Sequence, residues 1–186
     1  MPFDKVVICM VNLLALPYPR HKIESGSVCA DGLISINLSS DLAPEVGLPT
    51  DNFNEILFLH FDDIPFLRLT RRGENLKGPL VSDVKRAIAF AKRIHKKDSG
   101  AKIAVHCQAG KSRSAAIALA INASLNPERY EEVVAAMLAR DPEQQMCFNP
   151  RIVAIADKLL KTHRGLDFAL MKLCAPYRSW KKYWDY

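Results

Sequence analysis

The side chains with the clearest chemical potential lie in one short segment, between His106 and Ser114. Within it, the thiol of Cys107 is followed six residues later by the guanidinium of Arg113. Between them, Gly110 supplies a position at which the backbone can adopt a positive φ or approach a ligand closely. The planar fork of an arginine matches two oxygens of a phosphate, so these residue types indicate a nucleophile beside a phosphate-binding group.

The elements expected on either side of this segment give it a defined geometry. A short apolar strand is predicted over residues 102–106, and an Ala-, Ile- and Leu-rich helix over residues 112–125. Amide groups between such a strand and helix can converge on one point at the positive end of the helix. The same field stabilises a thiolate, so we expect the sulfur of Cys107 to be a nucleophile at neutral pH. The expected phosphate cradle consists of Gln108, Ala109, Gly110, Lys111, Ser112 and Arg113.

A His-Cys pair, five intervening residues and an Arg-Ser pair resemble the signature loop of the protein tyrosine phosphatase superfamily, and most of all its dual-specificity branch. We call residues 107–114 the signature loop. The resemblance implies that Cys107 is a nucleophile that forms a phosphocysteine intermediate and that Arg113 stabilises the transition state. It also implies that the Ser114 hydroxyl helps the sulfur to leave, that His106 organises the loop, and that no metal or other cofactor takes part.

The same superfamily uses an aspartic acid on a movable loop to protonate the leaving oxygen and then to activate water. Asp62 and Asp63 follow a predicted apolar strand, in a Phe-Asp-Asp sequence that resembles the phosphatases of regenerating liver. That resemblance makes Asp63 the expected general acid, while Asp62 either caps the loop or exchanges roles with it. Asp83 is a weaker alternative, because the helix dipole alone favours a carboxylate in the first turn of a predicted helix. Residues 65–80 are predicted to be a loop that separates the acid unusually far from the nucleophile.

Short apolar or alternating segments predict strands, and longer periodic segments predict helices. The predicted strands are residues 5–11, 32–38, 55–61 and 102–106. The predicted helices are residues 82–97 with Ser82 as cap, 112–125, 128–140, 150–164 with Asn149 as cap, and a last helix from Leu166. This order predicts a single α/β domain over residues 1–186, with a mainly parallel, twisted sheet of about four or five strands, helices on both faces and a helical C-terminal half.

Composition and charge narrow the function classes further. The chain has 186 residues, a formal net charge of +6 and 49% hydrophobic side chains, and its apolar runs are too short for a membrane span. Its five cysteines form no paired spacing, which favours neither a disulfide framework nor a zinc site and predicts a cytoplasmic location. The positive charge is spread over many short clusters, so we expect no nucleic-acid partner.

These features predict a cysteine-dependent phosphatase that hydrolyses phosphomonoesters of phosphotyrosine or dual-specificity protein substrates, or of a small phosphoester. A phosphoinositide or inositol phosphate phosphatase is an alternative, because Lys111 places a second cation in the cradle. An inactive phosphate-binding module, which keeps the cradle without a working acid, is another. A nucleotide-binding P-loop is excluded, because that motif requires glycine at the position of Val105.

Overall fold

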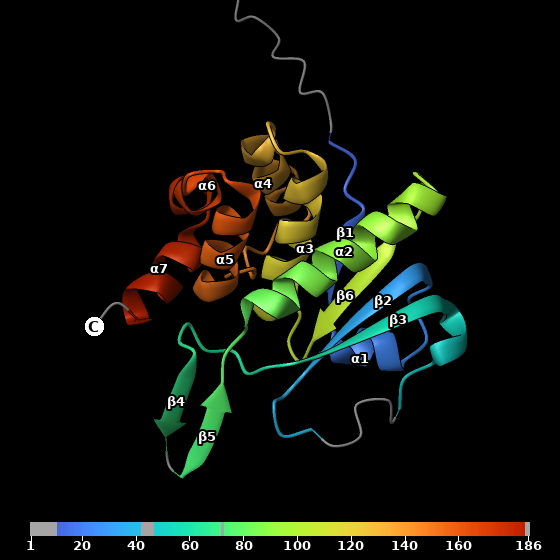
Figure 1. The fold of residues 1–186 in the computed structure, drawn as a ribbon, viewed down its shortest axis with the longest axis horizontal. Helices are drawn as coiled ribbons and strands as arrows, with labels where there is room; N and C mark the ends of the chain where they lie inside the picture. Colours follow the sequence, from blue (N-terminus) through green and yellow to red (C-terminus); the bar gives the residue numbers. More distant parts are fainter. Residues whose placement is uncertain (1–10, 42–46, 72, 185–186) are drawn as a thin grey trace, which may run out of the picture.

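The computed structural model describes residues 11–41, 47–71 and 73–184, and the centre of this part of the chain is a parallel sheet (Figure 1). Its strands lie in the order β1–β6–β2–β3. All three neighbouring pairs are parallel, so the carboxyl ends of the strands reach the same edge of the sheet. The strand bounds are Ala15–Pro19 for β1, Ala30–Asn37 for β2, Phe53–His60 for β3 and Ile103–Cys107 for β6.

Seven α-helices lie within the described ranges, and one of them, α1, is short. Their bounds are Arg20–Glu24 for α1, Val81–Lys97 for α2, Arg113–Leu125 for α3, Tyr130–Leu138 for α4, Pro150–Leu160 for α5, Gly165–Leu173 for α6 and Ala175–Trp184 for α7. The helices from α3 onward form the C-terminal half of the chain, as predicted.

Alternating side chains of the sheet divide the core between its two faces. On β2, Ile34 and Ile36 join the large apolar cluster that includes side chains of helices α2 to α7. Leu33 points to the other face, where it packs in a smaller cluster with Ile23 of α1. The prediction of an α/β fold with helices on both faces of a parallel sheet is therefore confirmed.

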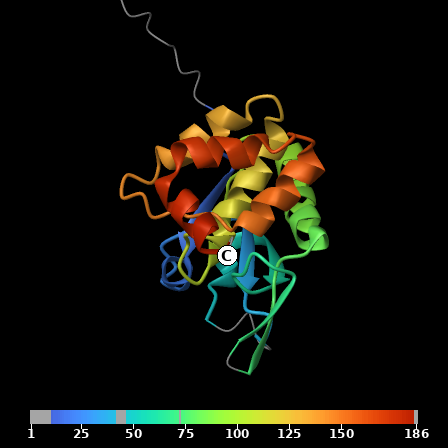
Figure 2. The ribbon, with the colours of Figure 1, turned by 90° about the vertical axis from the view of Figure 1, so that its left-hand side faces the viewer.

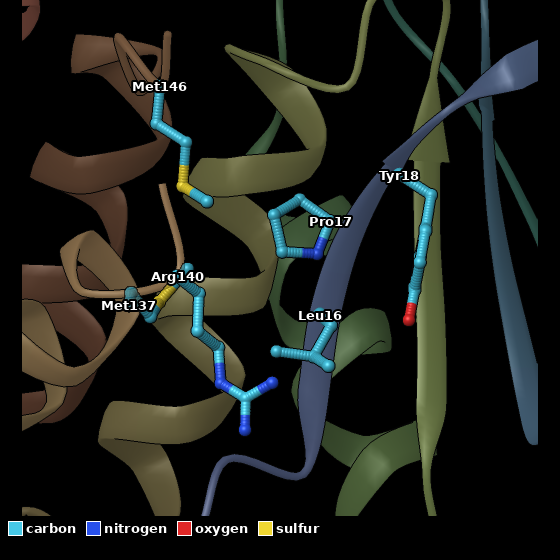
Figure 3. Close-up of a pocket in the computed structure, with 6 residues that line it drawn as sticks. All are labelled: Leu16, Pro17, Tyr18, Met137, Arg140 and Met146. Carbon is cyan, nitrogen blue, oxygen red and sulfur yellow. The ribbon is translucent and has the colours of Figure 1, made fainter. Parts of the chain in front are cut away.

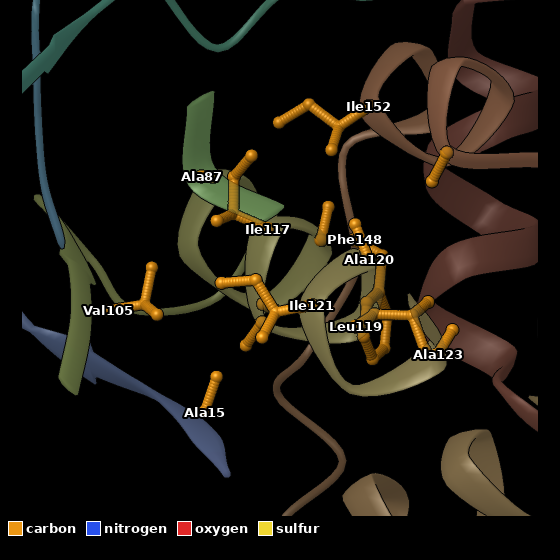
Figure 4. Close-up of a cluster of buried hydrophobic side chains, with 14 of the residues drawn as sticks. Ala15, Ala87, Val105, Ile117, Leu119, Ala120, Ile121, Ala123, Phe148 and Ile152 are labelled. Carbon is orange, nitrogen blue, oxygen red and sulfur yellow. The ribbon is translucent and has the colours of Figure 1, made fainter. Parts of the chain in front are cut away.

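Helix α3 passes through the middle of the large cluster (Figure 4). Every residue from Arg113 to Ser124 is buried, and the helix is apolar on nearly all sides, as an enclosed helix must be. Side chains from other elements surround it, among them Val105 of β6 and Ile152 of α5. This packing fixes the direction of α3 and hence of the free amide groups at its N-terminus.

The strand prediction for the N-terminal segment did not identify β1. Residues 5–10 lie outside the described part of the chain, and Val11 belongs to no strand. The strand that pairs with β6 on the side opposite β2 is instead Ala15–Pro19, where Pro17 and Pro19 argued against a strand in the sequence. Proline is tolerated there because β1 lies at the edge of the sheet, where no strand of the described residues pairs with one side of its backbone.

The prediction of a loop over residues 65–80 was wrong in part, because a hairpin forms within it. Strand β4, Arg68–Arg71, pairs antiparallel with β5, Glu74–Lys77. The hairpin projects away from the sheet and the helices in both views (Figures 1 and 2). Leu69 faces Leu76 in its only cross-strand pair of apolar residues, so the sequence lacks the apolar alternation that predicts strands.

The predicted helices are present with shifted ends. Helix α2 has Leu80 rather than Ser82 as its N-cap residue, so that cap prediction was wrong. Asn149 caps α5 as predicted, but the helix ends earlier than predicted because Lys161 adopts the left-handed conformation. No helix in the ranges that the structure describes combines the length and apolar character needed to cross a bilayer.

Candidate active site

The signature loop connects the carboxyl end of β6 to the N-terminus of α3. Cys107 is the last residue of the strand and Ser112 is the N-cap residue of the helix. Gly110 has φ +75°, and a Cβ atom there would lie 2.5 Å from the backbone nitrogen of Pro19. Both the positive φ and the close approach of β1 therefore require glycine at this position, for the reasons that the sequence indicated.

The reactive side chains of the loop lie at the base of this turn. Cys107 is buried, and its Sγ lies 3.2 Å from the Oγ of Ser114. The guanidinium of Arg113 is also buried and is anchored through Nη1, which donates to the carbonyl oxygens of Phe61 at 2.9 Å and Asn37 at 3.4 Å. Its Nε is buried without a hydrogen-bond partner among the described residues. An unpaired buried donor of this kind fits an anionic ligand.

A second segment, residues 147–149, is joined to the signature loop by backbone hydrogen bonds. The amides of Cys147 and Phe148 donate to the carbonyl of Lys111 at 3.0 and 3.3 Å, and the amide of Asn149 donates to the carbonyl of Ser112 at 3.2 Å. These bonds occupy outward carbonyl groups of the loop. They tie the start of α5 to the start of α3.

Asp63 lies against the signature loop. Its Oδ1 accepts a hydrogen bond from the hydroxyl of Ser112 at 2.7 Å and another from Nδ2 of Asn149 at 2.8 Å. Its Oδ2 has no hydrogen bond within the described chain, and the side chain is only partly buried. One carboxylate oxygen is thus held in place by two donors, while the other accepts no hydrogen bond from the described residues. Asn149, predicted only as a helix cap, also positions this carboxylate, and that second contact was missed.

Asp62 has a different set of contacts from its neighbour. It is buried and accepts hydrogen bonds from the amide and hydroxyl of Ser39, at 3.3 and 2.5 Å, and from the amide of Lys77 at 2.6 Å. Its own amide donates to the carbonyl of Lys77 at 2.7 Å. Both carboxylate oxygens are occupied, and they fasten the base of the hairpin to the loop after β2. This contact set matches the expectation that Asp62 caps the loop.

Asp83 lies in the first turn of α2, and its Oδ2 accepts a hydrogen bond from the amide of Leu80 at 2.8 Å. The side chain is buried. Its contacts are those of a helix-capping carboxylate, the role that its position in the sequence already explained.

His106 is completely buried beneath the loop, and neither ring nitrogen makes a hydrogen bond with a described residue. Burial, together with the positive charge of Arg20, lowers the pKa of His106 to about 4. The ring is therefore neutral near pH 7. Its contribution to the loop is made by packing and not by charge.

Arg20 is a second arginine at this edge of the sheet, and the sequence analysis missed it. Its backbone amide donates to the carbonyl of Gln108 at 3.2 Å. Its guanidinium donates to Glu24 at 2.7 Å and to the side-chain oxygen of Asn37 at 3.2 Å. Since Asn37 also accepts from Arg113, the two arginines share one anchor. The sequence offered little indication of Arg20, because no predicted helix or strand placed residue 20 near the signature loop.

The other described cysteines differ from Cys107. Cys147 lies beside the loop, and burial raises its pKa to about 11, with the negative charge of Asp63 adding to the effect. Burial also raises the pKa of Cys174. Both are therefore thiols at neutral pH, while Cys29 is exposed and unpaired. Cys147 is a neighbouring thiol that serves as a control for Cys107.

A cavity of about 200 Å³ lies between β1 and the region around α4 (Figure 3). Its walls include Leu16 and Tyr18 of β1, Met137 of α4, and the side chains of Arg140 and Met146. Its lining residues include neither Asp63 nor any residue of the signature loop. We do not include it in the candidate active site.

Comparison with known structures identifies a shared fold. A human tyrosine phosphatase-like serine/threonine/tyrosine-interacting protein matches with a TM-score of 0.58 and 16% identity, over 82% of this chain and 95% of that one. PTPMT1 in complex with PI(5)P gives a TM-score of 0.53 and 16% identity, over 82% and 93%. DUSP15 gives a TM-score of 0.51 and 20% identity, over 84% and 92%. The chain therefore has a dual-specificity phosphatase-like α/β fold.

Sequence comparison adds one partial match. Residues 71–149, less than half of the chain, match the model of the family described as the Rit1 DUSP-like domain. The match contains the signature loop and Asn149, but it begins after Asp63. No curated protein sequence matches the chain.

Proposed function

We propose that the protein is a cysteine-dependent phosphatase that hydrolyses phosphomonoesters through a phosphocysteine intermediate. The observation that carries this proposal is the position of the Cys107 sulfur at the N-terminus of α3, in the same loop as Arg113, whose buried Nε has no hydrogen-bond partner among the described residues. Free amide groups and the dipole of α3 favour both a thiolate and a bound phosphate at this point.

In the first step, the sulfur of Cys107 attacks phosphorus, so that an S–P bond forms as the bond to the leaving oxygen breaks. Amide groups of the loop and the guanidinium of Arg113 stabilise the charge on the equatorial oxygens. Asp63 donates its proton to the leaving oxygen. In the second step, Asp63 takes a proton from water, which attacks phosphorus and breaks the S–P bond. The hydroxyl of Ser114, 3.2 Å from the sulfur, donates to the departing thiolate.

The contacts of the two adjacent carboxylates support Asp63 as the general acid. Asp63 faces the signature loop through Ser112 and keeps one oxygen unpaired within the described chain. The oxygens of Asp62 are occupied by Ser39 and Lys77, so a proton on that group would break structural hydrogen bonds.

Three substrate classes fit this site. Phosphotyrosine or dual-specificity protein substrates fit the fold that the chain shares with DUSP15. Phosphoinositides fit the extra cations Lys111 and Arg20, and PTPMT1 was solved in complex with PI(5)P. A phosphorylated RNA is a third class, because the family that residues 71–149 match is named for initiator tRNA.

An inactive phosphate-binding module is the alternative from a different functional class. This alternative has support because one protein with a similar fold is described as a tyrosine phosphatase-like interacting protein. Such a module would bind phosphate but form no phosphoenzyme.

The test is turnover of an aryl phosphate in the presence of a chelator. We expect Cys107→Ser to lower the rate by roughly 10³-fold or more, because a hydroxyl is a far weaker nucleophile than a thiolate. The matched control is Cys147→Ser, which removes a neighbouring, partly buried thiol and should retain most of the activity. Equal rates for Cys107→Ser and the wild-type chain would contradict the proposal.

A further inference from the structure

A second concave site lies on the C-terminal helices. It is a cleft of about 500 Å³ formed by α5, the turn from α5 to α6, and α7. We call it the α5–α7 cleft. Its lining residues are Pro150, Ala154, Asp157, Lys158, Lys161, His163, Arg164, Asp167 and Lys181.

The cleft has an excess of positive charge that its own carboxylates do not neutralise. Asp167 pairs with Arg164 at 2.8 Å and with Lys181 at 2.5 Å. Asp157 is buried and accepts hydrogen bonds from the turn, including one from the amide of Leu166 at 2.9 Å. The exposed Lys158 and Lys161 form no ion pair with any described residue. Two cations therefore remain available to an anionic ligand.

The backbone of the turn holds one of these cations in an unfavourable conformation. Lys161, His163 and Arg164 all have positive φ, at 57°, 52° and 68°. Lys161 is the C-cap residue of α5, where glycine adopts the left-handed conformation with less strain. Lysine at this position gives the cleft a positive charge, which glycine, the residue with less strain there, would not supply.

One exposed aromatic ring lies beside a cation of the cleft. Phe168 is 60% exposed, and the guanidinium of Arg164 lies 5.1 Å from the centre of its ring. Cations next to exposed aromatic rings are typical of surfaces that hold a nucleic-acid backbone and stack its bases.

The cleft begins beside the candidate active site. Pro150 lines it, and the preceding Asn149 donates to Asp63. Helix α5 then leads to Lys158 and Lys161, roughly 12 and 16 Å along the axis from Pro150 at 1.5 Å per residue. A single inositol phosphate ring cannot span this separation. A nucleic-acid strand can, because its phosphates repeat about every 3.4 Å along a helix axis.

We propose that the α5–α7 cleft binds the sugar–phosphate backbone of an RNA strand and thereby positions a phosphomonoester of that strand near Cys107. The positioning step rests on the proposed phosphatase function, whereas binding in the cleft does not. The expectation of no nucleic-acid partner relied on the lack of a long basic run in the sequence. The fold instead assembles the charge from α5, the following turn and α7, and contacts of this kind bind phosphate without reading base sequence.

The binding test uses fluorescence anisotropy with a labelled, 5′-phosphorylated single-stranded RNA of about 12 nucleotides, long enough to pass from the signature loop beyond the cleft. The protein is the full chain carrying Cys107→Ser, so that turnover does not consume the probe. The cleft variant is Lys158→Gln/Lys161→Gly. The matched control is Lys92→Gln/Lys96→Gln on α2, which removes two exposed lysines that form no ion pair within the described chain.

We expect the cleft variant to bind RNA about tenfold more weakly than the parent. The slope of log affinity against log salt should fall by about 1.4, or 0.7 for each lost phosphate contact to a single strand. The control should bind like the parent. Because glycine suits the conformation at position 161, the cleft variant should lose no stability in a urea titration. Weaker binding with unchanged stability separates lost contacts from misfolding.

Two outcomes would overturn the cleft proposal. In the first, the parent binds no RNA, or the cleft variant and the control bind it equally. In the second, the cleft variant binds RNA as tightly as the parent but binds vesicles of phosphatidylcholine with 5% phosphatidylinositol phosphate more weakly. That result would identify a membrane headgroup as the ligand. If RNA binding depends on the cleft while the wild-type chain hydrolyses no aryl phosphate, the cleft proposal is supported and the phosphatase proposal fails.

Discussion

Two segments meet at the carboxyl edge of the sheet, and they are held in different ways. The signature loop is fixed by its immediate surroundings, with Gly110 packed against the end of β1 and the base of the loop continuous with the buried α3. The acid segment, residues 61–80, is fixed by long-range contacts of its side chains. Asp62 reaches Ser39 and Lys77, and Asp63 reaches the loop. Adjacent residues in this segment therefore have different contacts, and we propose that Asp62 has a structural task and Asp63 a chemical one.

Substituting each carboxylate in turn gives the largest expected difference between these tasks. Asp63→Asn should slow hydrolysis of an alkyl phosphate, a poor leaving group, by about 10²-fold, because it removes the proton donor. A nitrophenyl phosphate should be affected much less. Steady-state rates with both substrates provide the measurement.

Asp62→Asn is the matched control, and its main effect should be on stability. An amide nitrogen cannot accept the hydrogen bonds that a carboxylate oxygen accepts from Ser39 or Lys77, so we expect a loss of about 1–3 kcal/mol in the free energy of unfolding. If Asp62→Asn shows the leaving-group dependence and Asp63→Asn does not, the assignment of roles is reversed.

The buried histidine beneath the loop predicts a pH dependence of stability. Burial lowers the pKa of His106 to about 4 in the folded chain, against 6.5 for an unperturbed histidine. Between these values the unfolded chain binds more protons, so the free energy of unfolding rises with pH and is unaffected by this group above about 6.5. From pH 7 to pH 5 this group should cost about 2 kcal/mol.

Urea titrations at pH 7 and pH 5 measure this dependence. His106→Asn should lose less stability than the wild-type chain over this interval, even if it is less stable at pH 7 through poorer packing. His60→Asn, at an exposed position of β3, should follow the wild-type chain. An unchanged pH dependence in His106→Asn would show that the ring is not held neutral by the fold.

The contrast between the two segments explains which features the sequence could predict. Strands β2, β3 and β6 and helices α2 to α6 follow from apolar periodicity, and the signature loop follows from residue types at fixed spacing. The Asn149–Asp63 contact joins residues 86 positions apart, and the shared anchor at Asn37 joins two arginines from different elements. Contacts of this kind depend on the folded arrangement, so local patterns could not indicate them.

The missed elements have a similar explanation. Strand β1 contains Pro17 and Pro19 and is possible only because it lies at an edge, which is a property of the sheet and not of the segment. The charge of the α5–α7 cleft is likewise divided among separate segments. Short clusters of lysine and arginine that looked dispersed along the chain become one surface when α5 and α7 lie together.

The most direct test of the central claim is detection of the phosphoenzyme. Asp63→Asn should slow the attack of water on the phosphocysteine, so an intermediate should accumulate with a substrate that has a good leaving group. We would quench that reaction with acid and map the mass of one phosphoryl group by peptide mass spectrometry. The account predicts this mass on the peptide that contains Cys107, and its loss when Cys107→Ser is added. Turnover with no phosphoryl group on Cys107, or with the group on another residue, would contradict it.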